Sequence, residues 1–265
     1  MLFPLRALLL VAPALAAAGA PLAAADLAEL KARKSIRVVV ASDEAPETFS
    51  VNPGARPGFE RELIEGFAKI QGLEVMAVPV KTHADRIPAL VAGKGDVIVA
   101  IFDLEERRKL VDFTAEVMPT HNVAVTMRPR PPVPNLDELR KLKVGVIQGT
   151  QPAQATVAAG GVPPSSIQAF DTIARLLDAL KSGSIGAAVL PISELALAGK
   201  RVAGLEAGTT VGAPGTSAWA VRKEDGALRT ALSDYLANTR RSGSWNRLVL
   251  KYFGEETLRV LGRGR

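Results

Sequence analysis

A strand followed by a turn and an arginine constrains this chain more than any other feature. In the segment GKGDVIVAIFDLEERRKLVDFT, Gly93 to Thr114, the apolar run Val97–Ile101 predicts a buried strand, and Arg107 follows a polar turn. The carboxyl ends of parallel strands in an α/β sheet face the crevice in which such sheets bind ligands. Arginine is the side chain best shaped to hold a carboxylate through two parallel hydrogen bonds. The segment therefore predicts an α/β sheet with an anion-binding residue at its ligand edge.

Short β-branched runs alternate with amphipathic segments along the rest of the chain, which is typical of an α/β fold with mostly parallel strands. The predicted strands are 36–41, 73–78, 97–101, 121–127, 144–147, 166–170, 187–190 and 218–222. The predicted helices are 59–71, 85–92, 172–181, 192–198, 227–241 and 245–253, with a further one directly after Gly149-Thr150. The proline-rich stretch Arg128–Pro134 disfavours regular structure, so we interpret it as the first hinge or boundary.

The first residues have the layout of a secretory signal peptide. Met1–Arg6 is a short basic start, Ala7–Ala18 is an apolar run, and Ala23-Ala24-Ala25 offers a cleavage site before Asp26. The apolar run is short for a membrane span, although an N-terminal anchor helix that stays attached is the alternative. The chain has no cysteine, which excludes a lipid-modified N-terminus, a disulfide and a thiolate metal site. We expect residues 1–25 to be a cleaved signal peptide and the mature protein to be periplasmic, not a lipoprotein.

The charge of the chain is moderately positive and scattered. Removal of residues 1–25 takes away only Arg6, so the 33 basic residues become 32, against 27 acidic residues. The densest basic runs are Lys31–Lys34 and Arg128–Arg130, and aromatic residues make up only 5% of the chain. A nucleic-acid-binding surface needs a basic patch or stripe, so no nucleic-acid partner is expected. The sequence predicts no cofactor and no metal, and the positive excess favours solubility or attraction of anionic solutes.

Several segments resemble, in order, the signature elements of the periplasmic solute-binding proteins of the polar amino-acid type, the family 3 extracellular binding proteins. The segments are PGFERELIEGFAKIQGLEV, RIPALVAGKGDVIVA, EERRKLVDFT, LRKLKVGVIQGT and LKYFGEE. The resemblance covers roughly residues 36–255 and implies the type II fold of this family, two α/β lobes that each hold a mostly parallel sheet and are joined by two hinge crossings. It predicts a discontinuous lobe 1, residues 34–126 and 216–265, and a lobe 2 of residues 127–215. A single doubly wound domain is the alternative.

The resemblance also implies a carboxylate site shared by the two lobes. Arg107 lies five residues before Asp112 of the VDFT triplet, where the family has its carboxylate-binding arginine; the alternative is a surface arginine beside Arg108. Gly149 and Thr150 match the second lobe's half of the same site. Backbone N–H groups at a strand-to-helix turn can bind an anion, although Thr150 can also simply cap the helix.

Three further positions are candidates for the wall of the pocket. His83 lies where many relatives place an aromatic ring that stacks on the ligand, and an exposed imidazole is the alternative. Glu44 follows the first strand at another position that is commonly aromatic, where a carboxylate can receive an ammonium or remain solvated. Phe49 is a candidate for the same wall, with a core position as its alternative.

Two positions depart from the family pattern. Asp103 stands near the carboxylate site, where it would repel an anionic ligand unless it pairs with Arg107 or Arg108. Pro191 stands where relatives carry the aspartate that receives the ligand's ammonium, and proline offers neither charge nor an N–H donor. An unpaired buried ammonium costs several kcal/mol. A zwitterionic ligand therefore needs a substitute for that aspartate, and the candidates are Asp43, Glu44, Asp103 and Glu194.

These features predict periplasmic binding of a small polar solute that bears a carboxylate, an amino acid or related organic acid, between two lobes. The resemblance implies that the protein is a monomer, not an enzyme, and delivers the solute to the permease of an ABC transporter. The first alternative, motivated by Pro191, is a periplasmic sensor or accessory protein on the same fold. The second is a periplasmic dehydratase or lyase, for which His83, Glu44, Asp103 and Glu105 are the acid/base candidates.

Overall fold

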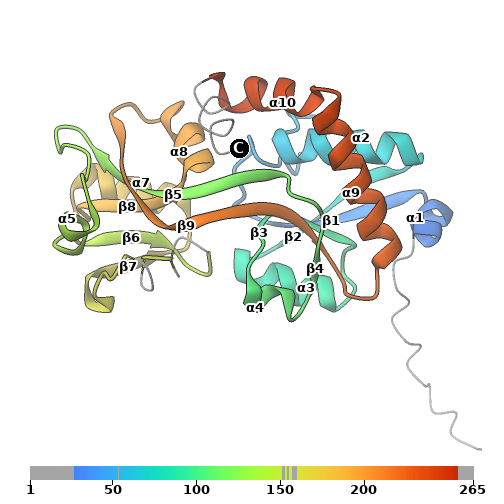
Figure 1. Ribbon diagram of the computed structural model, residues 1–265, viewed down its shortest axis with the longest axis horizontal. Coiled ribbons are helices and arrows are strands. Elements are labelled where there is room, and N and C mark those ends of the chain that lie inside the picture. Colours follow the sequence, from blue (N-terminus) through green and yellow to red (C-terminus); the bar gives the residue numbers. More distant parts are fainter. Residues whose placement is uncertain (1–26, 53, 151–152, 154, 157–159, 256–265) are drawn as a thin grey trace, which may run out of the picture.

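The computed structural model describes residues 27–255 except 53, 151–152, 154 and 157–159. The signal peptide predicted for residues 1–25 lies outside the described residues, as does part of the helix predicted after Thr150. Two groups of helices and strands lie side by side in Figure 1, and two long strands, β5 (Met118–Met127) and β9 (Leu205–Val221), run from one group into the other. None of the helices in the described part of the chain is long and apolar enough to cross a membrane.

The strands of both groups are hydrogen-bonded into one sheet, in the order β2-β1-β3-β9-β5-β8-β6-β7, with β4 paired to β9. The remaining strands are β1 (Ser35–Ala41), β2 (Glu74–Val80), β3 (Val97–Phe102), β4 (Asp112–Phe113), β6 (Val144–Ile147), β7 (Ile167–Phe170) and β8 (Ala187–Pro191). Strand β1 is parallel to β2 and β3, and β6 is parallel to β7 and β8. The antiparallel pair β5 and β9 joins these two parallel units. This architecture confirms the predicted two-lobe α/β fold, with lobe 1 around β1 and lobe 2 around β6.

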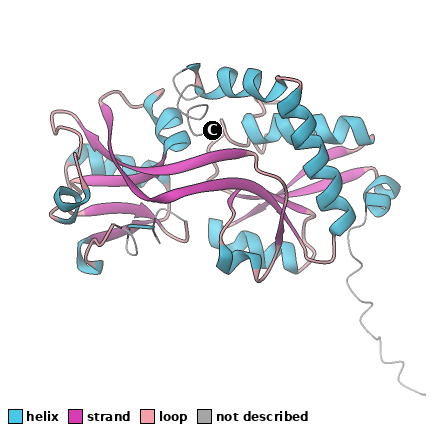
Figure 2. Ribbon diagram, viewed as in Figure 1, coloured by secondary structure: helices cyan, strands magenta, loops and turns pink. Residues whose placement is uncertain are grey.

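Helices flank the sheet of each lobe (Figures 1 and 2). They are α1 (Leu27–Arg33), α2 (Phe59–Gln71), η1 (His83–Asp85), α3 (Arg86–Val91), α4 (Glu105–Arg108), α5 (Leu136–Arg140), η2 (Pro164–Ser166), α7 (Ile173–Ser182), α8 (Ile192–Gly199), α9 (Gly226–Arg241) and α10 (Ser244–Phe253). In α2 the apolar residues Leu63, Ile64 and Phe67 recur at helical spacing and are buried, and Gly72 ends the helix in the left-handed conformation. Burial of each such side chain stabilises the fold by roughly 1.5–3 kcal/mol.

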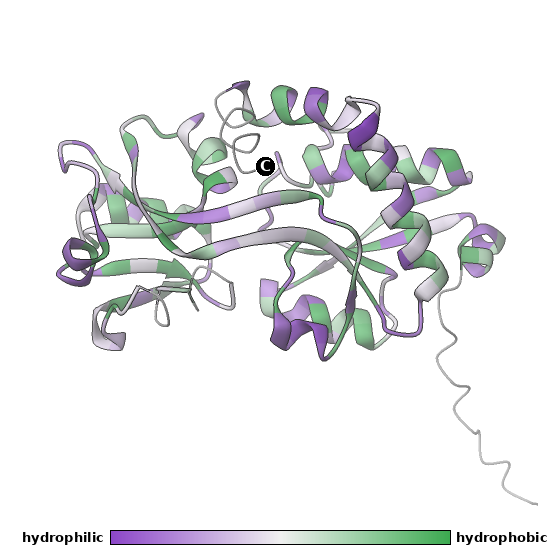
Figure 3. Cartoon of the chain, viewed as in Figure 1, coloured by the Kyte–Doolittle hydropathy of each residue, from purple (hydrophilic) through white to green (hydrophobic). Residues whose placement is uncertain are grey.

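The apolar core of lobe 1 lies between its sheet and the helices α2, α9 and α10. Trp219 of β9 is fully buried in this core, beside Phe59 and Phe67 of α2. Figure 3 shows apolar residues on the strands within each lobe, whereas the middle of β5 and β9, between the lobes, is pale or hydrophilic. At each end, the two long strands therefore contribute to the apolar core of one lobe. Their central residues, between the lobes, belong to neither core.

The pairing of β5 with β9 changes register at this polar centre. Thr120 pairs with Gly215, whereas Asn122 pairs with Val211, so one residue of β5 faces three residues of β9. Gly212 in this stretch has a φ of 78°, a conformation that glycine adopts without strain. Extra residues on one strand of a pair bend it locally. We propose that both hinge crossings lie here, while the lobe boundaries at 126/127 and 215/216 stay predictions.

The main difference from the predicted elements concerns β9. The sequence predicts a strand over 218–222, whereas β9 begins at Leu205. The stretch GTTVGAPGTS reads locally as a loop because of its glycines and its proline. Pairing along the length of β5 overrides this local preference, since strand formation depends more on partners than on propensity.

Candidate functional site

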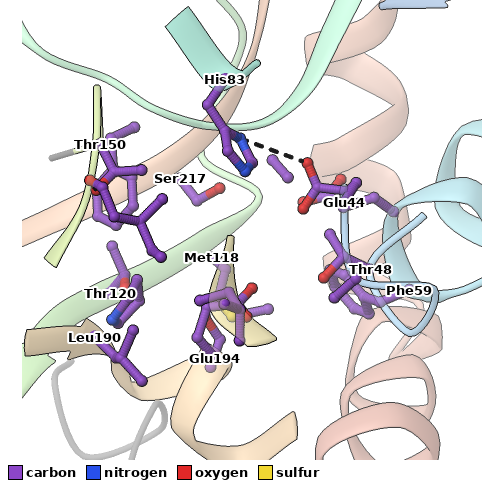
Figure 4. A pocket seen from close by; sticks show the side chains of 18 of the residues that line it. Glu44, Thr48, Phe59, His83, Met118, Thr120, Thr150, Leu190, Glu194 and Ser217 are labelled. Atoms are coloured by element: carbon purple, nitrogen blue, oxygen red, sulfur yellow. Dashed lines mark hydrogen bonds and ion pairs between the residues drawn. The ribbon is translucent and has the colours of Figure 1, made fainter. Parts of the chain in front are cut away.

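A cavity of about 120 Å³ lies between the two lobes, where the loop after β1 and the end of β3 face the ends of β6 and β8. An apolar protein cavity of about 150 Å³ holds benzene, so this volume fits a small solute. The side chains that line it come from both lobes (Figure 4). They are Asp43, Glu44, Ala45, Thr48, Phe59, Glu60, His83, Arg86, Ala100, Phe102, Arg107, Met118, Thr120, Ile147, Thr150, Ile173, Val189, Leu190, Pro191, Ser193, Glu194, Ser217 and Phe253.

Arg107 lines this cavity from α4, just after β3. Its Nη1 donates a 3.1 Å hydrogen bond to the carbonyl of Phe102, which holds the guanidinium at the end of the strand. None of the ion pairs among the described residues includes Arg107, whereas its neighbour Arg108 is exposed and paired with Asp103. Burial and the positive charge of Arg86 lower the pKa of Arg107 to about 10, so it stays charged at pH 7. A partly buried guanidinium without an acidic partner is suited to receive an anion.

His83 lies on the lobe 1 side of the cavity beside two carboxylates. Its Nδ1 is 3.9 Å from Oε2 of Glu44, and its Nε2 is 3.9 Å from Oδ1 of Asp43 (Figure 4 shows the first pair). Burial and the positive charges of Arg86 and Arg107 lower the pKa of His83 to about 3. The imidazole is therefore neutral at pH 7, with one donor and one acceptor nitrogen.

Arg86 supplies a second guanidinium in the cavity wall, but this guanidinium donates its hydrogen bonds to backbone carbonyls of the protein. Its Nη1 donates to the carbonyls of Val99 and Ala100, each at 3.2 Å, and lies 3.8 Å from Oε2 of Glu44. Ala100 has a φ of 50°, and the pairing of β3 with β9 shifts register around it. Because the register shifts there, the carbonyls of Val99 and Ala100 accept hydrogen bonds from Arg86. Arg86 therefore orders the end of β3, which leads to Arg107.

Thr150 lines the cavity from lobe 2, directly after β6. Its hydroxyl donates a 2.7 Å hydrogen bond to the carbonyl of Ile147, so the hydroxyl oxygen can still accept one. Gly149 is exposed and does not line the cavity. It has a φ of 73°, and a Cβ placed on it would lie 3.2 Å from the Cβ of Ala84 in lobe 1. The backbone of Gly149 is thus a point at which the two lobes approach each other closely.

Two further residues that the sequence singles out do not line the cavity. Asp103 forms a bidentate pair with the exposed Arg108, with distances of 2.5 and 2.7 Å, and is not paired with Arg107 among the described residues. Phe49 is 1% exposed in the core of lobe 1, where Arg61 lies over its ring. The structure therefore brings together Arg107, Thr150, His83 and Glu44, and places Gly149 at the adjacent lobe contact.

Two further carboxylates, the buried Glu60 and the half-buried Glu194, complete the cavity. Glu60, the second residue of α2, accepts a 2.6 Å hydrogen bond from Nε1 of Trp219, and burial raises its pKa to about 7. Glu194 lies in the first turn of α8, and burial together with the negative charge of Glu44 raises its pKa to about 7. Sequence reasoning named Glu194 only as one substitute among four, and it missed Glu60 because an acid in a helix's first turn is ordinary.

Metal chemistry finds no support in the residues that the structure describes. Among them, no group of three or more histidine, aspartate or glutamate side chains is arranged to hold a metal ion. The chain also has no cysteine.

Two α/β lobes around a charged cavity define a type II periplasmic binding protein, and the comparisons agree. Residues 36–255 match the bacterial extracellular solute-binding proteins, family 3, and the chain belongs to this family. Among solved structures, a mutant of ArgBP from T. maritima has a TM-score of 0.76 and 26% identity, covering 86% of this chain and 99% of that one.

Two curated relatives belong to different classes of protein. A "Probable histidine-binding protein" of Campylobacter jejuni is 31% identical over 165 residues, which cover 56% of this chain and 62% of the relative. A "Membrane-bound lytic murein transglycosylase F" of Stutzerimonas stutzeri is 24% identical over 236 residues, 86% of this chain but 48% of the relative. The chain thus spans about half to two thirds of the length of these relatives, one of which is named as a binding protein and the other as an enzyme.

Proposed function

We propose that this chain captures a small solute that bears a carboxylate, an amino acid or related organic acid, in the cavity between its lobes. In this proposal the chain is exported through a cleaved signal peptide, works in the periplasm as a monomer and is not an enzyme. It delivers the solute to an ABC transporter permease in the inner membrane. Membership of the solute-binding family and the similarity to a histidine-binding protein support the proposal.

The observation that carries the proposal is the lack of an acidic partner for Arg107 among the described residues. This guanidinium faces a cavity, is anchored by one backbone carbonyl, and has no ion pair among the described residues. A carboxylate bound to it would form charge-assisted hydrogen bonds, which are roughly twice as strong as neutral ones. Thr150 of lobe 2 lines the same cavity, so one carboxylate can contact both lobes.

Contact with both lobes explains how binding would close the molecule. A ligand shifts an open–closed equilibrium only through contacts that are better in the closed state. Arg107 belongs to lobe 1 and Thr150 to lobe 2, and the register change between β5 and β9 lies between them. We infer a hinge motion about that register change, with the solute as the bridge.

A second candidate function, a dehydratase or lyase, is favoured by one observation. Glu194 lines the cavity with a pKa of about 7, the range that suits a general acid at neutral pH. Asp103, in contrast, is paired with Arg108 away from the cavity, and Glu105 is exposed. The remaining alternative is a sensor or accessory protein, motivated by Pro191, which lines the cavity where an ammonium-binding aspartate is expected.

A thermal-shift screen separates these functions. The mature protein, unfolded and refolded to remove carried-over solute, is mixed with amino acids, dicarboxylates, keto acids, polyamines or peptidoglycan fragments. A ligand at about a hundredfold its Kd adds about 2.7 kcal/mol of stability, which shifts the Tm by several degrees. We expect shifts only with carboxylates. Shifts only with compounds that lack a carboxylate would contradict the proposal, no shift would favour the sensor, and NMR detection of turnover would favour the enzyme.

A further inference from the structure

Glu194 is a half-buried carboxylate that the proposed carboxylate site does not use. It lies three residues after Pro191, in the first turn of α8, and lines the cavity from lobe 2. No hydrogen bond and no ion pair involves its side chain among the residues that the structure describes, in contrast to Glu60, which is bound by Trp219, and Glu44, which lies near Arg86. A partly desolvated carboxylate without a partner is costly, so its presence in the cavity wall suits a partner that arrives from outside.

A second unpartnered polar atom lines the same cavity. The hydroxyl oxygen of Thr120, in β5, is buried without a hydrogen-bond partner, and Thr120 as a whole is 4% exposed. Figure 4 shows Thr120 and Glu194 on the same side of the cavity, with Met118 near them. Both side chains can accept hydrogen bonds, and one of them carries negative charge. Together they suit a group that is positively charged and rich in N–H donors.

The position of Glu194 in the cavity determines where that positive group must be. Figure 4 shows Glu194 at the opposite end of the cavity from His83 and Thr150, with Thr120 between. Arg107 belongs to the end with His83, since its charge lowers the pKa of that imidazole. A ligand whose carboxylate contacts Arg107 and Thr150 therefore reaches Glu194 with a group at its other end. A cation at that other end of the ligand lies away from the positive charges of Arg86 and Arg107, which would repel it.

We propose that Glu194, with Thr120 in the same cavity wall, holds a cationic group at the end of the solute distant from its carboxylate. The inference rests on the proposed function, since it takes the carboxylate at Arg107 as given. It adds the class of solute: an amino or guanidino acid whose positive charge is separated from its carboxylate by several carbons. It also explains how this pocket holds a positive charge although Pro191 offers none.

Three isomer-matched carboxylates test this inference by calorimetry. The four-carbon set is butyrate, α-aminobutyrate and γ-aminobutyrate, and the six-carbon set is caproate, norleucine and ε-aminocaproate. We expect the compound with the distal amine to bind at least about tenfold more tightly than the other two in one set or both, because it alone gains a charge-assisted bond. In Glu194→Gln this preference should fall to about threefold or less, and in the exposed control Glu138→Gln it should be unchanged.

The outcomes separate the inference from the function on which it rests. If carboxylates bind and Arg107→Ala abolishes their binding, but Glu194→Gln leaves the order of affinities unchanged, the distal-cation site is wrong and the proposed function stands. Tighter binding of norleucine or α-aminobutyrate than of the distal amines would overturn the inference in the same way. If no carboxylate of either set binds in the wild type or depends on Arg107, the proposed function itself fails, and the inference fails with it.

Discussion

Nε1 of Trp219 donates a 2.6 Å hydrogen bond to Oε2 of Glu60, within the core of lobe 1. Trp219 is in β9, one of the two strands that connect the lobes, and Glu60 is in the first turn of α2 and lines the cavity. Both residues are buried, at 0% and 3% exposure. The bond therefore connects the cavity wall to a crossing strand, and it favours the charged form of a carboxylate whose pKa burial raises to about 7.

Replacement of Trp219 with phenylalanine tests this bond. The variant removes the donor, so Glu60 loses the hydrogen bond that favours its charged form. We expect a loss of stability of roughly 2–5 kcal/mol, the sum of a lost buried hydrogen bond and a smaller ring. The loss should be larger at pH 8, where Glu60 is ionised, than at pH 5. Urea unfolding at the two pH values measures it, and an equal loss at both would show that ionised Glu60 does not depend on Trp219.

Stability of the ligand-free protein should decrease from pH 5 to pH 8. Burial raises the pKa of Glu60 and of Glu194 from 4.5 to about 7. A carboxylic acid with a raised pKa in the folded state contributes stability that is present below about 4.5 and is lost as the pH rises through about 7. Glu194→Gln should remove its share of this dependence and make the ligand-free protein more stable at pH 8 by roughly 1–3 kcal/mol. Urea unfolding that finds the variant less stable at pH 8 would contradict this assignment.

Arg86 should be the arginine of the cavity on which stability depends most. Its guanidinium donates hydrogen bonds to the carbonyls of Val99 and Ala100 and lies 3.8 Å from Glu44 in the wall of the cavity. Arg86→Met leaves these groups without a cation, which we expect to cost roughly 3–5 kcal/mol. The control Arg128→Met breaks an exposed pair and should cost less than about 1 kcal/mol. Equal shifts of the two urea midpoints would show that Arg86 has no such role.

The contact between Gly149 and Ala84 should limit how closely the lobes approach. Gly149→Ala places a methyl group 3.2 Å from Ala84 and strains a φ of 73°. Gly183 is a matched control, because its φ is 74° but nothing lies within 4 Å of an added Cβ. Both variants should lose about 1 kcal/mol of stability. Only Gly149→Ala should weaken ligand binding in calorimetry, and equal affinities of the two variants would exclude a role of this contact in closure.

The fold could be predicted largely from local patterns, and the site only in part. Strand β6 and helix α2 have the predicted bounds, because hydrophobic spacing and a terminal glycine are local signals. The end of β9 could be predicted, whereas residues 205–217 could not, since their glycines and proline hide a strand that forms through pairing with β5. Arg107 stands out because a charge follows a buried strand. The neutral state of His83 and the isolation of Glu194 depend on burial and on charges far away in the chain, which spacing does not reveal.

The central claim, that Arg107 holds the carboxylate of the solute, is tested most directly by comparing two adjacent arginines. A carboxylate ligand from the thermal-shift screen is titrated calorimetrically into the wild type, Arg107→Ala and Arg108→Ala. Arg107 lines the cavity without an acidic partner, whereas Arg108 is exposed and paired with Asp103. We predict a loss of affinity of about a hundredfold or more for Arg107→Ala, with the fold intact, and a change of less than about threefold for Arg108→Ala. Unchanged affinity in a folded Arg107→Ala variant would contradict the account.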